Sequence, residues 1–462
     1  MFSPNYFKAC LPFVRFACIG FLFVGALCLL RLFVCEPTLG WDEAEQAVIA
    51  QQFSAGYLAQ PPLYYWLQYL VFQCLGISLF SIALLKFSLI FLCLYFYHQI
   101  CRLHCQDKLL AWCATLSWAL IPNISIDLLP HRTHAVLSLL AACLTWYWLI
   151  KPSRLSKSFW YAGFGIIIGI GCLAKSNYLL FLSILLLSAL TIKEFRQRLL
   201  QRHLLLSLVF ICLVSGGYWY WLIDNFATGM SSAFKLSLNN KDLKNGILQL
   251  LKAYLIYGIP VGLLALFFPF WRQKVEANSA NSLLWRYHLL VLPLLLLIVI
   301  TANLHDFKAH WALSLFFLSP LLIVSQITKT GYSVKRAKSY LVLCILVQLL
   351  ILAAWANRSY RLANFPLQPL VESIRKEQQP EVTLVSPSHW LLGSLMINLP
   401  AEHGFLLHRA LLHKPLPSGR LLIVWKGGEI PEWVDVLVPS SPERQIRKLV
   451  VNQVIMASYV YK

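Results

Sequence analysis

The chain has 462 residues, of which 59% are hydrophobic and only 13% are charged. A soluble domain carries about 25% charged residues, so this composition excludes an ordinary soluble protein. The formal net charge of +20 would suit a nucleic-acid partner, but the Lys and Arg residues fall in short clusters between apolar segments. Such clusters are typical of the cytoplasmic loops of membrane proteins, and we expect no nucleic-acid partner.

Apolar segments of about 20 residues recur along the chain and predict an all-α polytopic membrane protein. A transmembrane β-barrel would instead alternate apolar and polar residues in segments of about ten. The first apolar segment lacks a small-residue cleavage site before Glu36, so we interpret it as a retained span. About eleven spans are expected, at 14–34, 83–101, 109–124, 132–150, 159–174, 178–192, 204–222, 250–270, 286–303, 309–327 and 339–356.

The basic clusters fix the expected orientation. If the N-terminus is inside, they all lie on the cytoplasmic side together with Lys8 and Arg15. The segment 62–80 is also apolar enough to span, but a span there would move every later cluster outside. We therefore expect an amphipathic helix that lies on the outer membrane surface. The aromatic residues expected at the level of the lipid headgroups are Tyr64, Tyr65, Trp66 and Tyr69.

The sequence divides into a predicted transmembrane domain, residues 1–356, and a tail, residues 357–462. Within the first domain, residues 35–82 form an expected external loop with helices beside the membrane. The tail contains the strand-like runs VTLVS, RLLIVW, VDVLV and LVVNQVIM, which alternate with turns rich in Pro, Gly and charge. This pattern predicts a small external α/β domain.

An acidic stretch, WDEAEQ, begins the external loop at Trp41. Gly40 precedes it, and a short helix is expected from Trp41 to Gly56. Helical spacing places Asp42, Glu45 and Gln46 on one face. Carboxylates in a first turn suit the helix dipole, so a simple acidic cap is one interpretation. Anchoring to an anionic membrane would use basic residues, which favours a second interpretation in which the carboxylates have a chemical role.

The loop resembles the first external loop of the GT-C glycosyltransferases. The matching elements are Asp-Glu-Ala at 42–44 and, about 20 residues later, PPLYYWL at 61–67. The similarity extends over about residues 36–320 and is strongest in this loop. The branch it most resembles is the bacterial one related to protein O-mannosyltransferases, which includes the aminoarabinose and galacturonic acid transferases of lipid A and lipopolysaccharide core. The form DEAEQ, with Gly-Tyr at 56–57 and Gln-Pro-Pro at 60–62, is closest to the galacturonosyltransferase group.

The resemblance implies an inverting enzyme of the bacterial inner membrane whose active site faces the periplasm. It would move a sugar from a polyprenyl phosphate to lipid A, lipopolysaccharide or another envelope acceptor, surrounded by membrane lipids. Asp42 occupies the position of the family's catalytic carboxylate, which would act as a general base or balance charge on the sugar ring. The sugar stays open, and so does a divalent metal cofactor. Substrate contacts are expected in this loop from Glu43, Glu45, Gln60 and Tyr64.

Further polar residues are expected at the outer ends of later spans. The turn DLLPHRTHAV supplies His131, Arg132 and His134. Family members often have Thr-Asp where this chain has Thr133-His134, which puts a second catalytic carboxylate in doubt. His134 would bind sugar or phosphate, or else be a buried histidine satisfied by the backbone.

Two lysines break the positive-inside pattern. Lys175 follows the fifth span, and HDFKAHW places Lys308 and His310 before the tenth. Cations on the outer side suit an anionic partner such as a lipid phosphate leaving group. The alternative is that they anchor the protein at the membrane surface. A looser basic surface is expected in the loop 223–249 from Lys235, Lys241 and Lys244.

Other functions fit parts of the pattern. His98, Cys101, His104 and Cys105 have the spacing of metal ligands on a helix face, but they lie at the cytoplasmic end of a span and we predict no metal site there. A transporter or flippase of lipid-linked glycans would need ionisable residues mid-membrane and broken helices. A protein O-glycosyltransferase and a non-catalytic scaffold also stay open as hypotheses.

Overall fold

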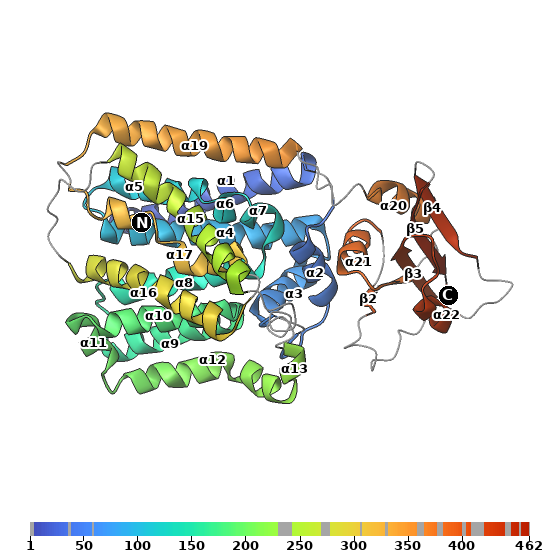
Figure 1. The fold of residues 1–462 in the computed structure, drawn as a ribbon, viewed down its shortest axis with the longest axis horizontal. Coiled ribbons are helices and arrows are strands. Elements are labelled where there is room, and N and C mark those ends of the chain that lie inside the picture. Colours follow the sequence, from blue (N-terminus) through green and yellow to red (C-terminus); the bar gives the residue numbers. More distant parts are fainter. Residues whose placement is uncertain are drawn as a thin grey trace. The chain divides into compact units, whose positions relative to one another are not determined.

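The computed structural model is mostly helical and has one small sheet near the C-terminus (Figure 1). Its contacts divide the chain into two compact units. The first unit contains 1–53, 65–87 and 355–462, and the second contains 54–64 and 88–354. The structure describes residues 4–35, 38–57, 60–229, 243–268, 278–304, 307–328, 331–357, 365–376, 382–399, 403–407, 420–438, 445–451 and 454–461.

Long apolar helices confirm a multi-pass membrane protein. Within the described residues, seven helices are long and apolar enough to cross a bilayer, or up to nine if two bent helix pairs each form one span. The seven are α1 Pro4–Phe33, α4 Leu79–His104, α9 Lys157–Ala174, α12 Leu204–Asp224, α15 Leu243–Phe267, α16 Ser279–Thr301 and α19 Val334–Asn357.

The remaining expected spans coincide with bent or shorter helices. One bent pair turns by 78° and the other by 116°. The first contains α5 Lys108–Leu116, η1 Ser117–Leu120, α6 Pro122–Ser125 and α7 Leu128–His131, and the second contains α10 Asn177–Leu190 and α11 Lys193–Leu199. The shorter segments are α8 His134–Ile150 and the run η3 Ala309–Ala312, α17 Leu313–Phe316 and α18 Leu321–Val324. A single turn, α13 Phe226–Gly229, follows α12.

Glycines allow α9 and α12 to approach closely, and the two helices lie side by side in Figure 1. A Cβ atom added to Gly165 would lie 2.4 Å from the carbonyl oxygen of Ser207. One added to Gly169 would lie 2.7 Å from the Cβ of Val214. Small residues at such contacts are typical of membrane helices, which associate by close packing in a solvent that is itself apolar.

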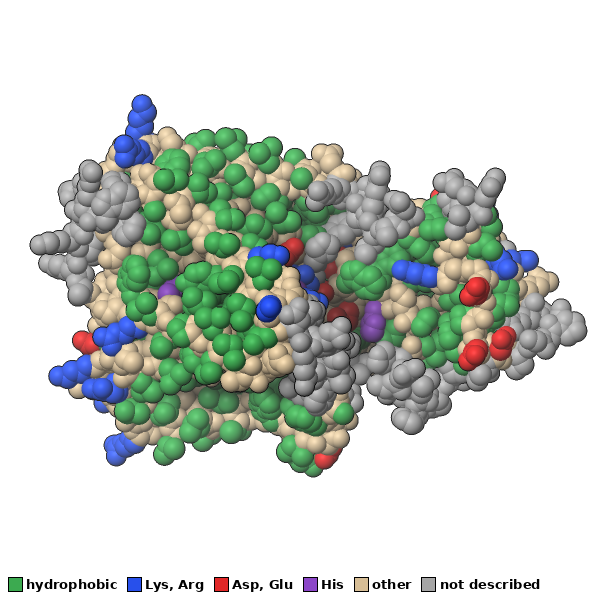
Figure 2. Space-filling view, in the orientation of Figure 1, with side chains coloured by type: hydrophobic (Ala, Val, Ile, Leu, Met, Phe, Trp, Pro, Cys, Tyr) green, Lys and Arg blue, Asp and Glu red, His purple; other side chains and the backbone are tan. Residues whose placement is uncertain are grey.

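Basic side chains gather at one end of the helix bundle, around α11 and the start of α19, while hydrophobic side chains cover its flank (Figure 2). This distribution agrees with the basic clusters that led us to predict a cytoplasmic N-terminus.

We predict that the N-terminus is cytoplasmic and the C-terminus is on the opposite side. A reporter enzyme that is active only outside the cytoplasm, fused after Lys462, should be active. A fluorescent reporter that matures only in the cytoplasm should stay dark at the same position. The reverse pair of results would contradict this orientation.

Helix α3, Leu63–Leu75, corresponds to the segment expected on the membrane surface. Its 13 residues extend about 20 Å, which is less than the about 30 Å of a bilayer core. The expected headgroup positions were wrong for Tyr64 and Tyr65, because both side chains are fully buried. Trp66 stacks on Phe53 at 5.4 Å between ring centroids, so protein packing determines where these aromatic side chains lie.

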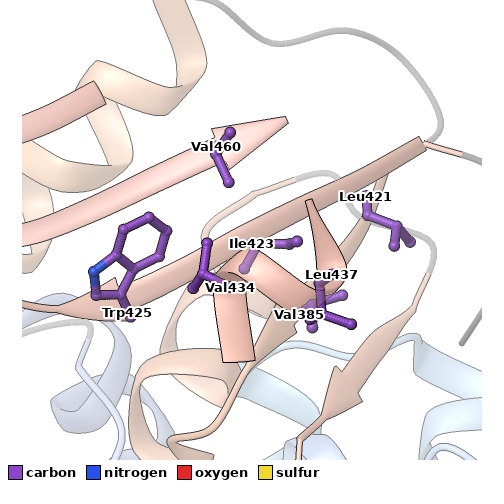
Figure 3. Close-up of a cluster of buried hydrophobic side chains, with 7 residues drawn as sticks. All are labelled: Val385, Leu421, Ile423, Trp425, Val434, Leu437 and Val460. Atoms are coloured by element: carbon purple, nitrogen blue, oxygen red, sulfur yellow. The ribbon is translucent and has the colours of Figure 1, made fainter. Parts of the chain in front are cut away.

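The C-terminal sheet confirms the predicted α/β domain. The strand order is β2-β1-β3-β5-β4. Strands β2, β1 and β3 are parallel, and β5 is antiparallel to both β3 and β4. Buried apolar side chains from the strands and one helix form a core (Figure 3). The elements are α20 Leu367–Lys376, β1 Val382–Ser386, α21 His389–Met396, β2 Gly404–Leu406, β3 Arg420–Lys426, α22 Glu432–Leu437, β4 Arg447–Val451 and β5 Val454–Tyr461.

One expected strand was wrong. The run VDVLV lies in α22 and the residue after it. Val434 and Leu437 are three residues apart, and both join the core against β3. That spacing places two side chains on one face of a helix but on opposite faces of a strand. The first turn of α22 also carries Glu432 and Asp435, which suit the helix dipole.

Candidate active site

The acidic stretch forms α2, Trp41–Ile49. The helix ends at Ala50 and is therefore shorter than the predicted helix to Gly56. Gly40 precedes the first turn in an extended conformation, and its N–H donates to Glu43 Oε2 at 3.0 Å. This is one half of a capping box, in which the side chain at the third helical position satisfies a backbone donor at the helix start.

Glu43 is the central residue of a buried ionic group, which we call the Glu43 triad. Its Oε1 lies 2.5 Å from Lys86 Nζ, and its Oε2 lies 3.3 Å from Arg31 Nη2. All three side chains are buried. Burial alone would raise the pKa of Glu43, but Lys86, Arg31 and the Gly40 N–H outweigh it and lower the pKa to about 2. With both oxygens engaged, Glu43 is better suited to holding α2 than to the substrate contact expected from the sequence.

Asp42 and Glu45 are more accessible than Glu43. Both side chains are half-buried. Asp42 is close enough to Lys86 for an electrostatic interaction. Glu45 accepts a hydrogen bond from the Tyr65 hydroxyl at 2.7 Å. The first turn of α2 therefore carries one carboxylate that is locked in the protein and one, Asp42, that is partly open to a substrate.

The second unit brings the predicted basic residues together, and we call them the cationic group after Arg132, Lys175 and Lys308. It consists of Arg132, His134, Lys175, Lys308 and His310. Arg132 Nη2 lies 3.3 Å from His310 Nδ1. His310 also interacts electrostatically with Lys175 and Lys308, and His134 interacts with Lys175. These residues come from three separate segments, at the start of α8, the end of α9 and the start of η3, so their convergence is a property of the fold.

Two further observations describe the surroundings of the cationic group. His134 is buried at the start of α8, and its ring lies 5.4 Å from the ring of Tyr64. The Nε atom of Arg132 is buried and has no hydrogen-bond partner among the residues that the structure describes. A buried guanidinium donor left without an acceptor favours a bound anion at this position.

The other expected site residues are less informative. Gln60 is half-buried in the turn before α3. The side chain of His131 lies outside the described residues, as do Lys235 and Lys241 of the expected basic surface. Lys244 is exposed near the start of α15.

The cluster near the end of α4 makes ordinary polar contacts. His98 bonds to Thr115 at 2.9 Å. His104 lies between Asn281, at 2.8 Å, and the indole N–H of Trp146, at 3.1 Å. Across the described ranges, no three His, Cys, Asp or Glu side chains group closely enough to hold a metal ion. These contacts favour a structural role for His98 and His104.

Arg31 and Lys86 are the functional residues that the sequence analysis missed. Each is a cation inside an apolar helix, Arg31 in α1 and Lys86 in α4. A charge within a membrane span is costly and usually has a partner. That signal was present in the sequence, but it did not identify Glu43 as the partner.

Residues 59–221 match the protein family described as Dolichyl-phosphate-mannose-protein mannosyltransferase. The structure adds a bundle of apolar helices and a small C-terminal α/β sheet domain. The match and the helices agree with the predicted multi-pass membrane glycosyltransferase of the GT-C type.

Two characterised proteins are similar to the chain over most of its length. The lipopolysaccharide core galacturonosyltransferase RgtB of Rhizobium johnstonii is 29% identical over 439 residues, which cover 88% of each chain. RgtA of the same organism is 24% identical over 432 residues, 88% of this chain and 85% of its own. The crystal structure of ArnT from Cupriavidus metallidurans bound to undecaprenyl phosphate has the same fold, with a TM-score of 0.68, 11% identity and 98% coverage of both chains.

Proposed function

We propose that the protein transfers a sugar, with galacturonic acid as the favoured candidate, from a polyprenyl phosphate to a lipopolysaccharide-type acceptor. The reaction would take place at the periplasmic face of the bacterial inner membrane. The convergence of Arg132, His134, Lys175, Lys308 and His310 carries the proposal, because basic side chains gathered in this way would suit a phosphate. Galacturonosyltransferase relatives that align over most of the chain support the choice of sugar and acceptor.

The proposed reaction is an in-line displacement with inversion. An acceptor hydroxyl oxygen forms a bond to the anomeric carbon while the bond from that carbon to the phosphate oxygen breaks. The electron pair leaves with the polyprenyl phosphate. Asp42 takes the hydroxyl proton as general base. If the acceptor is itself a phosphate, no proton moves, and Asp42 would orient the acceptor or balance positive charge on the sugar ring.

The cationic group would stabilise the departing phosphate. Negative charge increases on that phosphate as the bond to the sugar breaks, and fixed cations near it lower the barrier without rearranging in the transition state. Arg132 suits this role because its planar guanidinium presents several donors to phosphate oxygens. The solved ArnT structure was obtained with undecaprenyl phosphate bound, which supports a polyprenyl phosphate as the donor here.

A transfer assay tests the proposal directly. Purified protein in liposomes would receive polyprenyl-phosphate galacturonic acid with radiolabelled sugar and lipopolysaccharide from a strain that lacks this modification. Label should appear in the lipopolysaccharide, and mass spectrometry should show one added hexuronic acid. Transport of the labelled lipid across the bilayer without transfer would instead support a flippase.

We expect Lys175→Ala and Lys308→Ala each to reduce transfer by about tenfold or more, the scale of a lost charge-assisted contact. The proteins should remain folded in the membrane. The measurement is turnover together with the affinity for polyprenyl phosphate. Lys335→Ala, which removes an exposed lysine at the start of α19, is the matched control and should behave as wild type. Unchanged turnover and affinity in both variants would show that Lys175 and Lys308 do not bind the donor and only anchor the protein at the membrane surface.

A further inference from the structure

The C-terminal domain holds α2 at three points. Before the helix, the indole N–H of Trp390 donates to the carbonyl of Leu39 at 2.8 Å. In its middle, Gly393 of α21 lies against Ala44, where an added Cβ would come within 2.6 Å of the Ala44 carbonyl oxygen. Figure 1 shows α21 beside α2. These contacts belong to one compact unit, so the domain has a fixed position on the helix that carries Asp42.

The third point lies just after α2. The side-chain amide of Gln51 donates to the carbonyl of Gly404 at 3.0 Å and accepts from the Gly404 N–H at 2.9 Å. Gly404 begins β2, the strand at one edge of the sheet. The amide therefore pairs with the strand edge as a neighbouring peptide would.

Lys426, the last residue of β3, lies against the same tryptophan that contacts the start of α2. The Lys426 ammonium lies 4.6 Å from the ring centroid of Trp390 and 5.4 Å from that of Phe365. Trp390 in turn contacts Trp41, with 6.5 Å between their ring centroids. Trp41 immediately precedes Asp42 and is 52% exposed. An exposed aromatic ring and a cation thus share Trp390 as a neighbour, and Trp390 contacts the residue before Asp42.

Lys426 is an exposed residue whose ammonium lies over two aromatic rings. The two rings shield part of its ammonium from water, and this burial lowers the pKa of Lys426 below its usual range. Among the described residues, no carboxylate lies within ion-pair distance of Lys426. A cation–π contact compensates part of the lost hydration, and an anion from outside the chain would compensate more.

We propose that Trp41 and Lys426 form a subsite for the acceptor saccharide. The Trp41 ring would stack on a sugar ring, and the Lys426 ammonium would bind a phosphate or carboxylate on that saccharide. Aromatic rings offer apolar faces that pack against the C–H face of a sugar. The subsite rests on the proposed transfer function and adds to it a role for the C-terminal domain in recognising an anionic acceptor.

The test measures acceptor kinetics in neutral-lipid liposomes with two acceptors, one intact and one stripped of its phosphates and acidic sugars. Lys426→Met should raise KM for the intact acceptor by about tenfold, the scale of one charged contact, with kcat within about twofold. Lys426→Arg should retain most of the affinity. For the stripped acceptor, Lys426→Met and wild type should have the same KM.

Two further variants sharpen the test. Trp41→Ala should raise KM for both acceptors. Trp41→Phe keeps an aromatic ring and should have a KM close to that of the wild type. Lys448→Met removes an exposed lysine from β4 of the same domain and should change neither constant.

Each remaining outcome has a distinct meaning. A wild-type KM in Lys426→Met would overturn the subsite while leaving the transfer function intact. An effect of Lys426→Met that requires anionic phospholipid and ignores the acceptor's charge would assign Lys426 to lipid headgroups and also overturn the proposal. An absence of transfer by the wild-type protein would instead contradict the proposed function itself.

Discussion

Asp42→Asn should leave the protein folded and reduce sugar transfer by about 10²-fold or more, the scale of a lost acid–base or electrostatic group. Asn is nearly isosteric with Asp, and loss of the charge from the first turn of α2 costs only about 0.3–1 kcal/mol of interaction with the helix dipole. A structural cap would therefore tolerate the change, whereas a general base requires the charge. The measurement is transfer of radiolabelled sugar by purified protein, alongside thermal unfolding in detergent.

Glu45→Gln is the matched control for Asp42→Asn. It removes a carboxylate from the same helix, but its hydrogen bond from Tyr65 can be replaced by the amide oxygen of Gln. We expect a smaller loss of activity than in Asp42→Asn. Wild-type transfer by Asp42→Asn would show that the acidic stretch is a cap and that the proposed mechanism is wrong.

Glu43→Gln should have the opposite profile, with a large loss of stability. The change leaves Arg31 and Lys86 buried without their shared carboxylate. Removing one partner from a buried ionic group costs about 3–5 kcal/mol, because the remaining charges stay desolvated. The expected result is a lower unfolding temperature in detergent and reduced accumulation in the membrane.

The pH dependence of stability provides the control for Glu43. Its pKa is lowered from 4.5 to about 2 in the folded protein. A lowered pKa contributes stability above the unfolded value, and that contribution is lost as the pH falls towards 2. The stability difference between wild type and Glu43→Gln should therefore be constant near neutral pH and shrink below pH 4.5. A difference that does not depend on pH would contradict the ionic origin of the effect.

Local signals predicted most of the membrane fold. Apolar length located the helices, and basic clusters separated the spans from α3, because both are properties of short segments. The same reasoning failed for Tyr64 and Tyr65. Aromatic residues at a helix start suit a membrane interface, but here the protein buries them, and Tyr65 donates to Glu45. Burial depends on the rest of the chain, which a local pattern does not contain.

The candidate site was predictable where a family motif or an out-of-place charge marked a residue. The motif marked Asp42, and the positive-inside pattern marked Lys175 and Lys308. The distinct role of Glu43 was not predictable, because it depends on two cations brought from other helices. The proposed role of Lys426 was not predictable either. Lysines are common at strand ends, and the sequence does not reveal that this one packs beside Trp390.

The contacts between the C-terminal domain and α2 have a consequence for the order in which the chain folds. The contacts from Trp390 to Leu39 and from Gly404 to Gln51 join residues 351 and 353 positions apart. During synthesis, α2 therefore emerges long before the residues that hold it. Until the last part of the chain has been translated and folded, the Glu43 triad can hold α2, but the contacts from the C-terminal domain cannot form. A product that stops shortly before Trp390 would contain the acidic motif, yet α2 would lack its contacts with Trp390 and Gly404.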